Sequence, residues 1–184
     1  IALLCYNNRD LLEQFLPEVI STTPQTEDFG IFVIDNASTD STQDYLSTFG
    51  DRIHIINIEV NKGFTNGYKL GLAQINSEIF CLLSSDVQVS PNWLEPVVSL
   101  FDSDNHVAVI QPKIKSWHNK DQFEYAGASG GFIDYLGFPF CRGRIFYHTE
   151  ADTGQYDENE EIFWASGACF FIRSQVYYES GGLD

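Results

Sequence analysis

The sequence predicts an α/β fold with a Rossmann-like, mostly parallel central sheet and helices on both faces. Short apolar runs alternate four times with segments of helical periodicity in the first 105 residues, as in successive βαβ units. Each apolar run is followed by a polar cluster, as expected where parallel strands end at one edge of a sheet. The C-terminal third breaks the alternation and predicts a small additional β region.

The elements of the first half follow from periodicity and capping signals. Strands are expected at residues 1–5, 30–34, 53–58 and 79–83, and helices at 9–21, 41–49, 65–74 and 90–101. Ser41, with Asp44 three residues later, resembles a capping box for the second helix. Ser90 and Pro91 resemble an N-cap and a first-turn proline opening the fourth helix.

The second half is less regular. Strands are expected at residues 107–115 and 162–172, with a glycine- and aromatic-rich stretch at 127–146 between them. A long irregular segment in a compact domain is typical of a binding loop or a disordered one. The acidic run at 157–161 is interpreted as a solvated loop, because clustered like charges are usually exposed.

Composition restricts the function. The 184 residues include 26 acidic and 10 basic ones, and the formal net charge is −16. This balance argues against nucleic acid, whose binding depends on basic residues, and disfavours anionic membranes. A small anionic ligand stays compatible, because backbone N–H groups and a divalent metal can hold phosphate.

The cysteines and the apolar runs suggest a compartment. The four cysteines are Cys5, Cys81, Cys141 and Cys169, and no two of them form a C-x-x-C motif. All but Cys141 lie in apolar runs. We interpret all four as reduced core residues of a cytoplasmic protein. No run reaches the roughly 18 apolar residues of a membrane span, and no signal peptide is visible. The chain starts inside an apolar run and lacks methionine, so we interpret it as a fragment; the full-length protein could be peripheral at the inner face of the membrane.

Polar clusters follow the four predicted strands. They are Tyr6-Asn7-Asn8, Asp35-Asn36-Ala37-Ser38-Thr39-Asp40, Asn61-Lys62-Gly63-Phe64-Thr65-Asn66-Gly67 and Ser84-Ser85-Asp86-Val87-Gln88. Taken singly, Asp35 and Asp40 are better explained as turn and N-cap residues, and the third and fourth clusters fit a turn or loop as well as a site. Together, at one sheet edge, they suit a neutral base, a ribose and a metal-bound diphosphate.

The combined pattern resembles the family 2 glycosyltransferases, in particular their rhamnosyltransferase-like branch. The resemblance is carried by Asp35-Asn36-Ala37-Ser38-Thr39-Asp40, Asn61-Lys62-Gly63-Phe64, Leu82-Leu83-Ser84-Ser85-Asp86-Val87, Pro91-Asn92-Trp93-Leu94 and Trp164-Ala165-Ser166-Gly167-Ala168-Cys169. It implies a GT-A fold, a nucleotide-diphosphate sugar donor, and usually inversion at the anomeric carbon. The chain would be one GT-A domain, with a nucleotide-binding half at 1–105 and an incomplete acceptor-side half at 106–184.

The same resemblance implies the donor site. Its residues would be Tyr6, Asn7, Asp35, Asn36, Asp40, Lys62, Gly63, Asn66, Ser85 and Asp86. Asp35 would accept a hydrogen bond from the base, and Asn36 and Asp40 would support its loop. Asp86 would bind Mg²⁺ or Mn²⁺ as the first carboxylate of a D-x-D-like motif. Gln88 replaces the second carboxylate and would be a weak or water-mediated ligand.

The acceptor side is implied less completely. Trp164, Ser166 and Gly167 would lie beside a glycan or lipid-linked acceptor, although core packing is the alternative for a tryptophan. The family's general base follows a segment that here ends at Asp184, so we expect it beyond the last residue. We therefore expect donor binding with little or no turnover.

Two other functions stay open. One is a non-catalytic nucleotide-sugar or carbohydrate-binding module in which Gln88 marks a decayed metal site. The other is a sugar-phosphate nucleotidyltransferase, which would require a glycine-rich, basic loop after the first strand. The segment Tyr6-Asn7-Asn8-Arg9 has no glycine, so this alternative ranks last.

Overall fold

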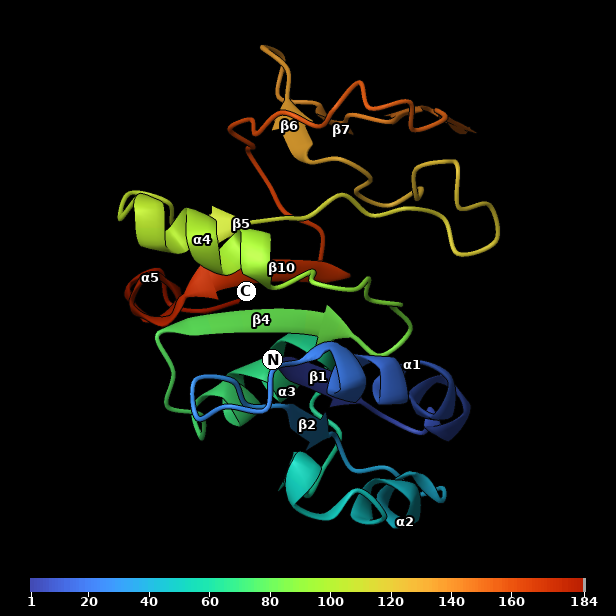
Figure 1. Ribbon diagram of the computed structural model, residues 1–184, viewed down its shortest axis with the longest axis vertical. Helices are drawn as coiled ribbons and strands as arrows, with labels where there is room; N and C mark the ends of the chain where they lie inside the picture. Colours follow the sequence, from blue (N-terminus) through green and yellow to red (C-terminus); the bar gives the residue numbers. More distant parts are fainter. Residues whose placement is uncertain (184) are drawn as a thin grey trace. The chain divides into compact units, whose positions relative to one another are not determined.

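The computed structural model describes residues 1–183, and the chain forms two compact units. The first unit comprises Ile1–Ala108 and Phe171–Asp184, and the second comprises Val109–Phe170 (Figure 1). The division into a nucleotide-binding half and an acceptor-side half stays a prediction.

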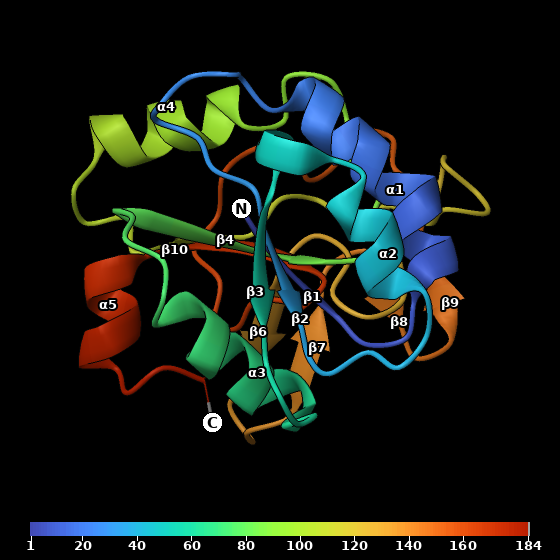
Figure 2. The same cartoon turned by 90° about the horizontal axis from the view of Figure 1, so that it is seen from below.

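The first unit contains the α/β layer. Its elements are β1 (Ala2–Cys5), α1 (Arg9–Thr22), β2 (Phe32–Asp35), α2 (Thr42–Ser47), the 3₁₀ helix η1 (Gly50–Arg52), β3 (His54–Asn57), α3 (Gly63–Leu72), β4 (Ile79–Ser84), α4 (Glu95–Ser103) and α5 (Ser174–Glu179). The main sheet has the strand order β3-β2-β1-β4-β10-β5, with β10 at Cys169–Arg173 and β5 at Val109–Ile110. Figure 2 shows α1, α2 and α4 along one face of the sheet and α3 and α5 along the other. The predicted fold class is confirmed.

The first four strands end at one level. β1 pairs in parallel with both β2 and β4, and β2 pairs in parallel with β3. Cys5 lies beside Asp35 and Asp35 beside Asn57, while Leu4 lies beside Ser84. The loops that leave these strands therefore start from one edge of the sheet.

The core explains why these elements form. α1 buries Leu12, Phe15 and Val19 on one stripe, and β4 is almost wholly buried, as expected of a parallel strand covered on both faces. α3 approaches the sheet closely at Gly71, where an added Cβ would lie 2.2 Å from Cδ1 of Ile34. All four cysteines are free and buried, as predicted.

One predicted capping bond and one predicted helix start are wrong. Ser41 is the N-cap residue of α2, as expected, but it makes no side-chain cap; it accepts a hydrogen bond from Arg9 Nη1 at 2.8 Å, and the Asp40 carboxylate accepts the Thr42 N–H at 3.0 Å. α4 begins at Glu95 and not at Ser90, because the preceding residues form turns that include Asn92 at a φ of +59°.

The strands predicted in the last third are shorter than expected, and α5 was missed. Arg173, at the end of β10, donates to the carbonyl oxygens of Val107 at 2.8 Å and Phe101 at 2.7 Å. These contacts fix β10 against the C-terminal end of α4, where a cation is favourable. Within residues 1–183, no helix has both the length and the apolar character needed to cross a bilayer.

The second unit contains the predicted small β region. Its hairpins pair β6 (Gly131–Ile133) with β7 (Pro139–Cys141), and β8 (Arg144–Ile145) with β9 (His148–Thr149). Phe123, Ala128 and Cys141 form its buried cluster, against which Tyr156 and Trp164 pack.

An ion-paired carboxylate gives the second unit a pH dependence. Hydrogen bonding from Lys113 lowers the pKa of the Asp152 carboxyl, and the Gly154 N–H and Lys115 act in the same direction. Since the folded-state pKa lies below the unfolded one, this stabilisation is complete above the ordinary carboxyl pKa of about 4 and is lost as the pH falls through the folded value.

We therefore expect Asp152→Asn to lower stability near neutral pH by up to roughly 1 kcal/mol, the range of partly exposed ion pairs. Thermal unfolding followed from neutral to acidic pH should show the variant converging with the wild type in acid. Asp121→Asn, an exposed aspartate of the same unit, is the matched control. Parallel pH profiles for wild type and Asp152→Asn would contradict this account.

Candidate functional site

Asn7 joins the loops that follow β1 and β2. Its Oδ1 accepts the backbone N–H of Thr39 at 2.7 Å and that of Asp40 at 3.3 Å, and its own N–H donates to Ser38 Oγ at 3.0 Å. The residue has a φ of +49°, a left-handed conformation that asparagine tolerates better than most residues. Asn7 thus holds the second loop in place.

Asn36 joins the loops that follow β2 and β3. The residue is 2% exposed; its amide donates to Asn61 Oδ1 and the Gly63 carbonyl, both at 3.1 Å, and accepts the Lys62 N–H at 3.0 Å. Close approach of α3 makes this possible: a Cβ at Gly67 would lie 3.2 Å from the Asn36 amide nitrogen. A fully hydrogen-bonded buried amide fixes the third loop against the second.

The loop after β4 joins the same edge. Asn8 donates to Ser85 Oγ at 2.5 Å, and Ser85 is 6% exposed. The exposed Asp86 accepts a hydrogen bond from Ser84 Oγ at 2.5 Å through Oδ1. Among the described residues, Oδ2 of Asp86 has no hydrogen-bond or ion-pair partner. Side-chain hydrogen bonds therefore connect all four predicted loops at one sheet edge.

Asp35 lies beneath this edge. It is 0% exposed; Oδ1 accepts the Ser38 N–H at 3.0 Å, and Oδ2 accepts Gln43 Nε2 at 2.6 Å. Cys5 is also nearby, and burial, followed by the charge of Asp35, raises the pKa of its thiol. Direct contact between Asp35 and a base therefore requires Gln43 to move, and no motif in the sequence indicates this.

Several predicted donor residues remain open to solvent. Tyr6 is 46% exposed, and Lys62, Asn66, Asp86 and Gln88 are exposed as well. The edge thus offers an aromatic ring, a cation, amides and a carboxylate around loops that are already fixed.

The residues present fit a divalent ion only if substrate completes its coordination. Residues 1–183 contain no group of three or more His, Cys, Asp or Glu side chains that could hold a metal. Asp86 supplies one exposed carboxylate. Mg²⁺ is commonly held by one or two carboxylates together with substrate phosphates, which matches Asp86 and a diphosphate.

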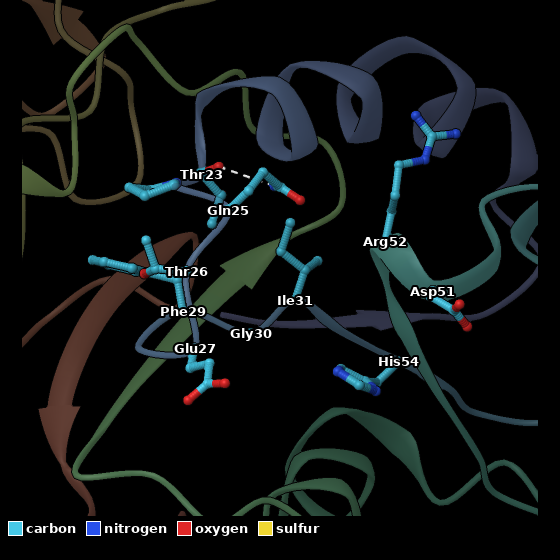
Figure 3. A pocket seen from close by; sticks show the side chains of 11 residues that line it. Thr23, Gln25, Thr26, Glu27, Phe29, Gly30, Ile31, Asp51, Arg52 and His54 are labelled. Atoms are coloured by element: carbon cyan, nitrogen blue, oxygen red, sulfur yellow. Dashed lines mark hydrogen bonds between the residues drawn. The ribbon is translucent and has the colours of Figure 1, made fainter.

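A hollow of about 360 Å³ lies at the opposite, amino-terminal edge of β2 and β3 (Figure 3). It is lined by residues 23–27, 29–31, 51, 52 and 54. The charged ends of Glu27 and Arg52 lie on different sides of it (Figure 3), so its charged groups do not converge on one point. The predicted donor-site residues lie at the other edge of the sheet, where β1–β4 end.

The predicted acceptor-side residues belong to the second unit. Trp164 Nε1 donates to the Phe132 carbonyl at 3.0 Å, and Ser166 is 7% exposed, with its hydroxyl donating to the Ala126 carbonyl at 3.0 Å. Gly167 is exposed. The polar groups of Trp164 and Ser166 thus serve the unit's own packing, and an acceptor role for these three positions stays a prediction.

Charged side chains of the second unit make contacts within that unit. Arg142 donates to the Ser129 carbonyl at 2.9 Å and lies over the rings of Phe132 and Tyr156. In the acidic run, Asp157 pairs with Lys113. Asp184, after which the general base was expected, lies outside the described residues.

The chain is similar to known proteins along nearly its whole length. The sequence matches "Glycosyl transferase family 2" over residues 1–181. "Inactive polypeptide N-acetylgalactosaminyltransferase-like protein 5" of Mus musculus is 24% identical over 230 residues, which cover 99% of this chain and 53% of that protein. The chain thus spans about half the length of this relative.

Two solved structures have a similar fold. GalNAc-T7, crystallised with UDP, GalNAc and Mn²⁺, has a TM-score of 0.69 at 15% identity, over 100% of this chain and 36% of that one. Residues 1–349 of S. aureus TarS give 0.67 at 16% identity, over 98% of this chain and 48% of that one. At such identities the likeness concerns the fold alone, which is the GT-A fold. Because the family match extends over nearly every residue, the chain belongs to the family 2 glycosyl transferases.

Proposed function

We propose that the chain binds a nucleotide-diphosphate sugar at the carboxyl edge of β1–β4 and contributes this donor site to sugar transfer onto a glycan or lipid-linked hydroxyl. The observation that supports this most is the hydrogen-bonded connection of all four loops. Asn7, Asn36 and Asn8 each join two loops. A donor site that is fixed before binding loses less entropy when the ligand arrives.

The roles of the open side chains follow from their chemistry. Tyr6 would flank the base and ribose, and Lys62 would offset charge on the diphosphate, which Gly63 and Asn66 would border. Asp86 would hold Mg²⁺ or Mn²⁺, with Gln88 beside it. When bound, the ion supplies positive charge that stabilises the departing diphosphate. GalNAc-T7, which shares this fold, was crystallised with UDP and Mn²⁺.

Transfer with inversion also requires a general base within about 3 Å of the acceptor hydroxyl. No residue of the connected loops is assigned that role, so donor binding is the direct test. Calorimetric titration with UDP, GDP and dTDP, each with and without Mn²⁺, should show binding of at least one nucleotide that tightens with metal. The absence of binding by all three in the presence of Mn²⁺ would overturn the proposal.

A second candidate is a donor-binding module without transfer activity. Gln88 in place of a second carboxylate favours it, as does the relative named as inactive. The full-length protein, incubated with UDP- and GDP-sugars and Mn²⁺, would distinguish the two: an enzyme releases nucleoside diphosphate above the uncatalysed rate, and a module binds donor without release.

A further inference from the structure

Gln43 donates a hydrogen bond to Asp35, the buried carboxylate to which the family resemblance assigns base recognition. Gln43 is exposed and belongs to the first turn of α2, and its Nε2 lies 2.6 Å from Asp35 Oδ2. An ionised carboxylate can only accept hydrogen bonds, so the amide must turn its nitrogen toward Asp35. The identity of the amide atoms, often ambiguous for glutamine, is therefore fixed here by chemistry.

The same nitrogen also donates to Asn57 Oδ1 at 3.3 Å, at the end of β3. With both N–H groups of Gln43 directed at Asp35 and Asn57, Oε1 of Gln43 is left as an acceptor. The Asn57 amide, whose oxygen faces Gln43, is left with Nδ2 as a donor. Both side chains are exposed, and neither Oε1 nor Nδ2 has a hydrogen-bond partner among residues 1–183.

Gln43 Oε1 and Asn57 Nδ2 lie near the loop after β1, where a base would bind. Asn57 is in register with Asp35, and Asp35 with Cys5, the residue before Tyr6. The two free amide groups thus stand level with the loop that carries the exposed aromatic ring. They are neutral and match the edge of a base on which a ring N–H adjoins a carbonyl, as in uracil, thymine and guanine.

We propose that Gln43, assisted by Asn57, is the residue that reads the donor base, and that Asp35 acts through it as a positioning residue. The proposal rests on the proposed function and changes the identity of the base-contacting group. Asp35 orients the side-chain amide of Gln43. This leaves Oε1 of Gln43 free to accept a hydrogen bond from the N–H of the base.

The test is calorimetric titration of UDP, CDP, GDP and inorganic pyrophosphate, all with Mn²⁺. Gln43→Ala should lower the affinity for the preferred nucleotide roughly three- to tenfold, the effect of one lost hydrogen bond. It should also reduce the differences in affinity among the three nucleotides. Pyrophosphate binding should not change, which a general loss of structure would not allow. Asn57→Ala, at an exposed strand end, should act in the same direction and provides the test if Gln43→Ala folds poorly.

Gln175→Ala is the matched control, because Gln175 is an exposed glutamine that donates to Glu179 within α5. Unchanged affinity and base preference in Gln43→Ala, or tighter nucleotide binding, would overturn the proposal and point to Asp35 as the direct contact. Failure of the wild-type chain to bind any nucleotide would instead remove the proposed function, and this inference with it.

Discussion

Replacing Asp86 by asparagine is expected to abolish the metal-dependent part of nucleotide binding. Asp86 is the exposed carboxylate at the end of β4, and one of its oxygens is held by Ser84. Loss of a residue that merely supports a metal ligand already costs roughly 10–100-fold in metal affinity, so loss of the charged ligand should cost at least as much. Binding that does not depend on metal should persist, because the other three loops are untouched.

The measurement is the ratio of UDP affinity with and without Mn²⁺, which should fall to about one in Asp86→Asn. Asp51→Asn makes the same change at an exposed aspartate of η1, near the opposite edge of the sheet, and should retain the wild-type ratio. Ser84→Ala removes the hydrogen bond that orients Asp86, so its ratio should lie between the two. An unchanged ratio in Asp86→Asn would place the ion elsewhere.

The sequence was sufficient to predict the sheet edge. Parallel pairing follows from alternating strands and helices, and parallel strands deliver the residues that follow them to one edge. The positions of Asp86 and of Asn36 at that edge followed from this rule alone. The hydrogen-bond partners did not, because they depend on how far each loop reaches across the sheet.

Asp35 illustrates that limit. Its position directly after an apolar run predicts a place at the sheet edge, and the structure has it there. Its second carboxylate oxygen accepts a hydrogen bond from Gln43, eight residues later in α2. No periodicity or motif marks Gln43, so only the three-dimensional arrangement shows its contact with Asp35.

The second unit was harder to predict for a different reason. Its strands are two or three residues long, too short for an alternating pattern to be recognised. Helix α4 was misplaced because a proline at Pro91 resembles a first-turn residue, whereas Pro96 occupies that place.

Replacing Trp164 by alanine is expected to destabilise the chain strongly, which separates a packing role from a sugar-stacking one. The indole lies flat on the backbone of Gly131: a Cβ there would come within 2.0 Å of the ring. Its N–H is bonded to Phe132, and Trp164 and Gly131 form an antiparallel bridge. Truncating a packed tryptophan costs roughly 3–5 kcal/mol, and a partly exposed one belongs at the lower end of that range.

Chemical denaturation should therefore show a lower midpoint for Trp164→Ala, while Trp117→Ala, at a tryptophan that is 42% exposed, should change little. Gly131→Ala provides the decisive comparison. This substitution keeps Trp164, but the added methyl group occupies the space in which the indole packs. Gly131→Ala should therefore destabilise the chain to a similar extent. Wild-type stability in both Trp164→Ala and Gly131→Ala would show that the ring is free of this packing, and would restore Trp164 as a candidate platform for the acceptor sugar.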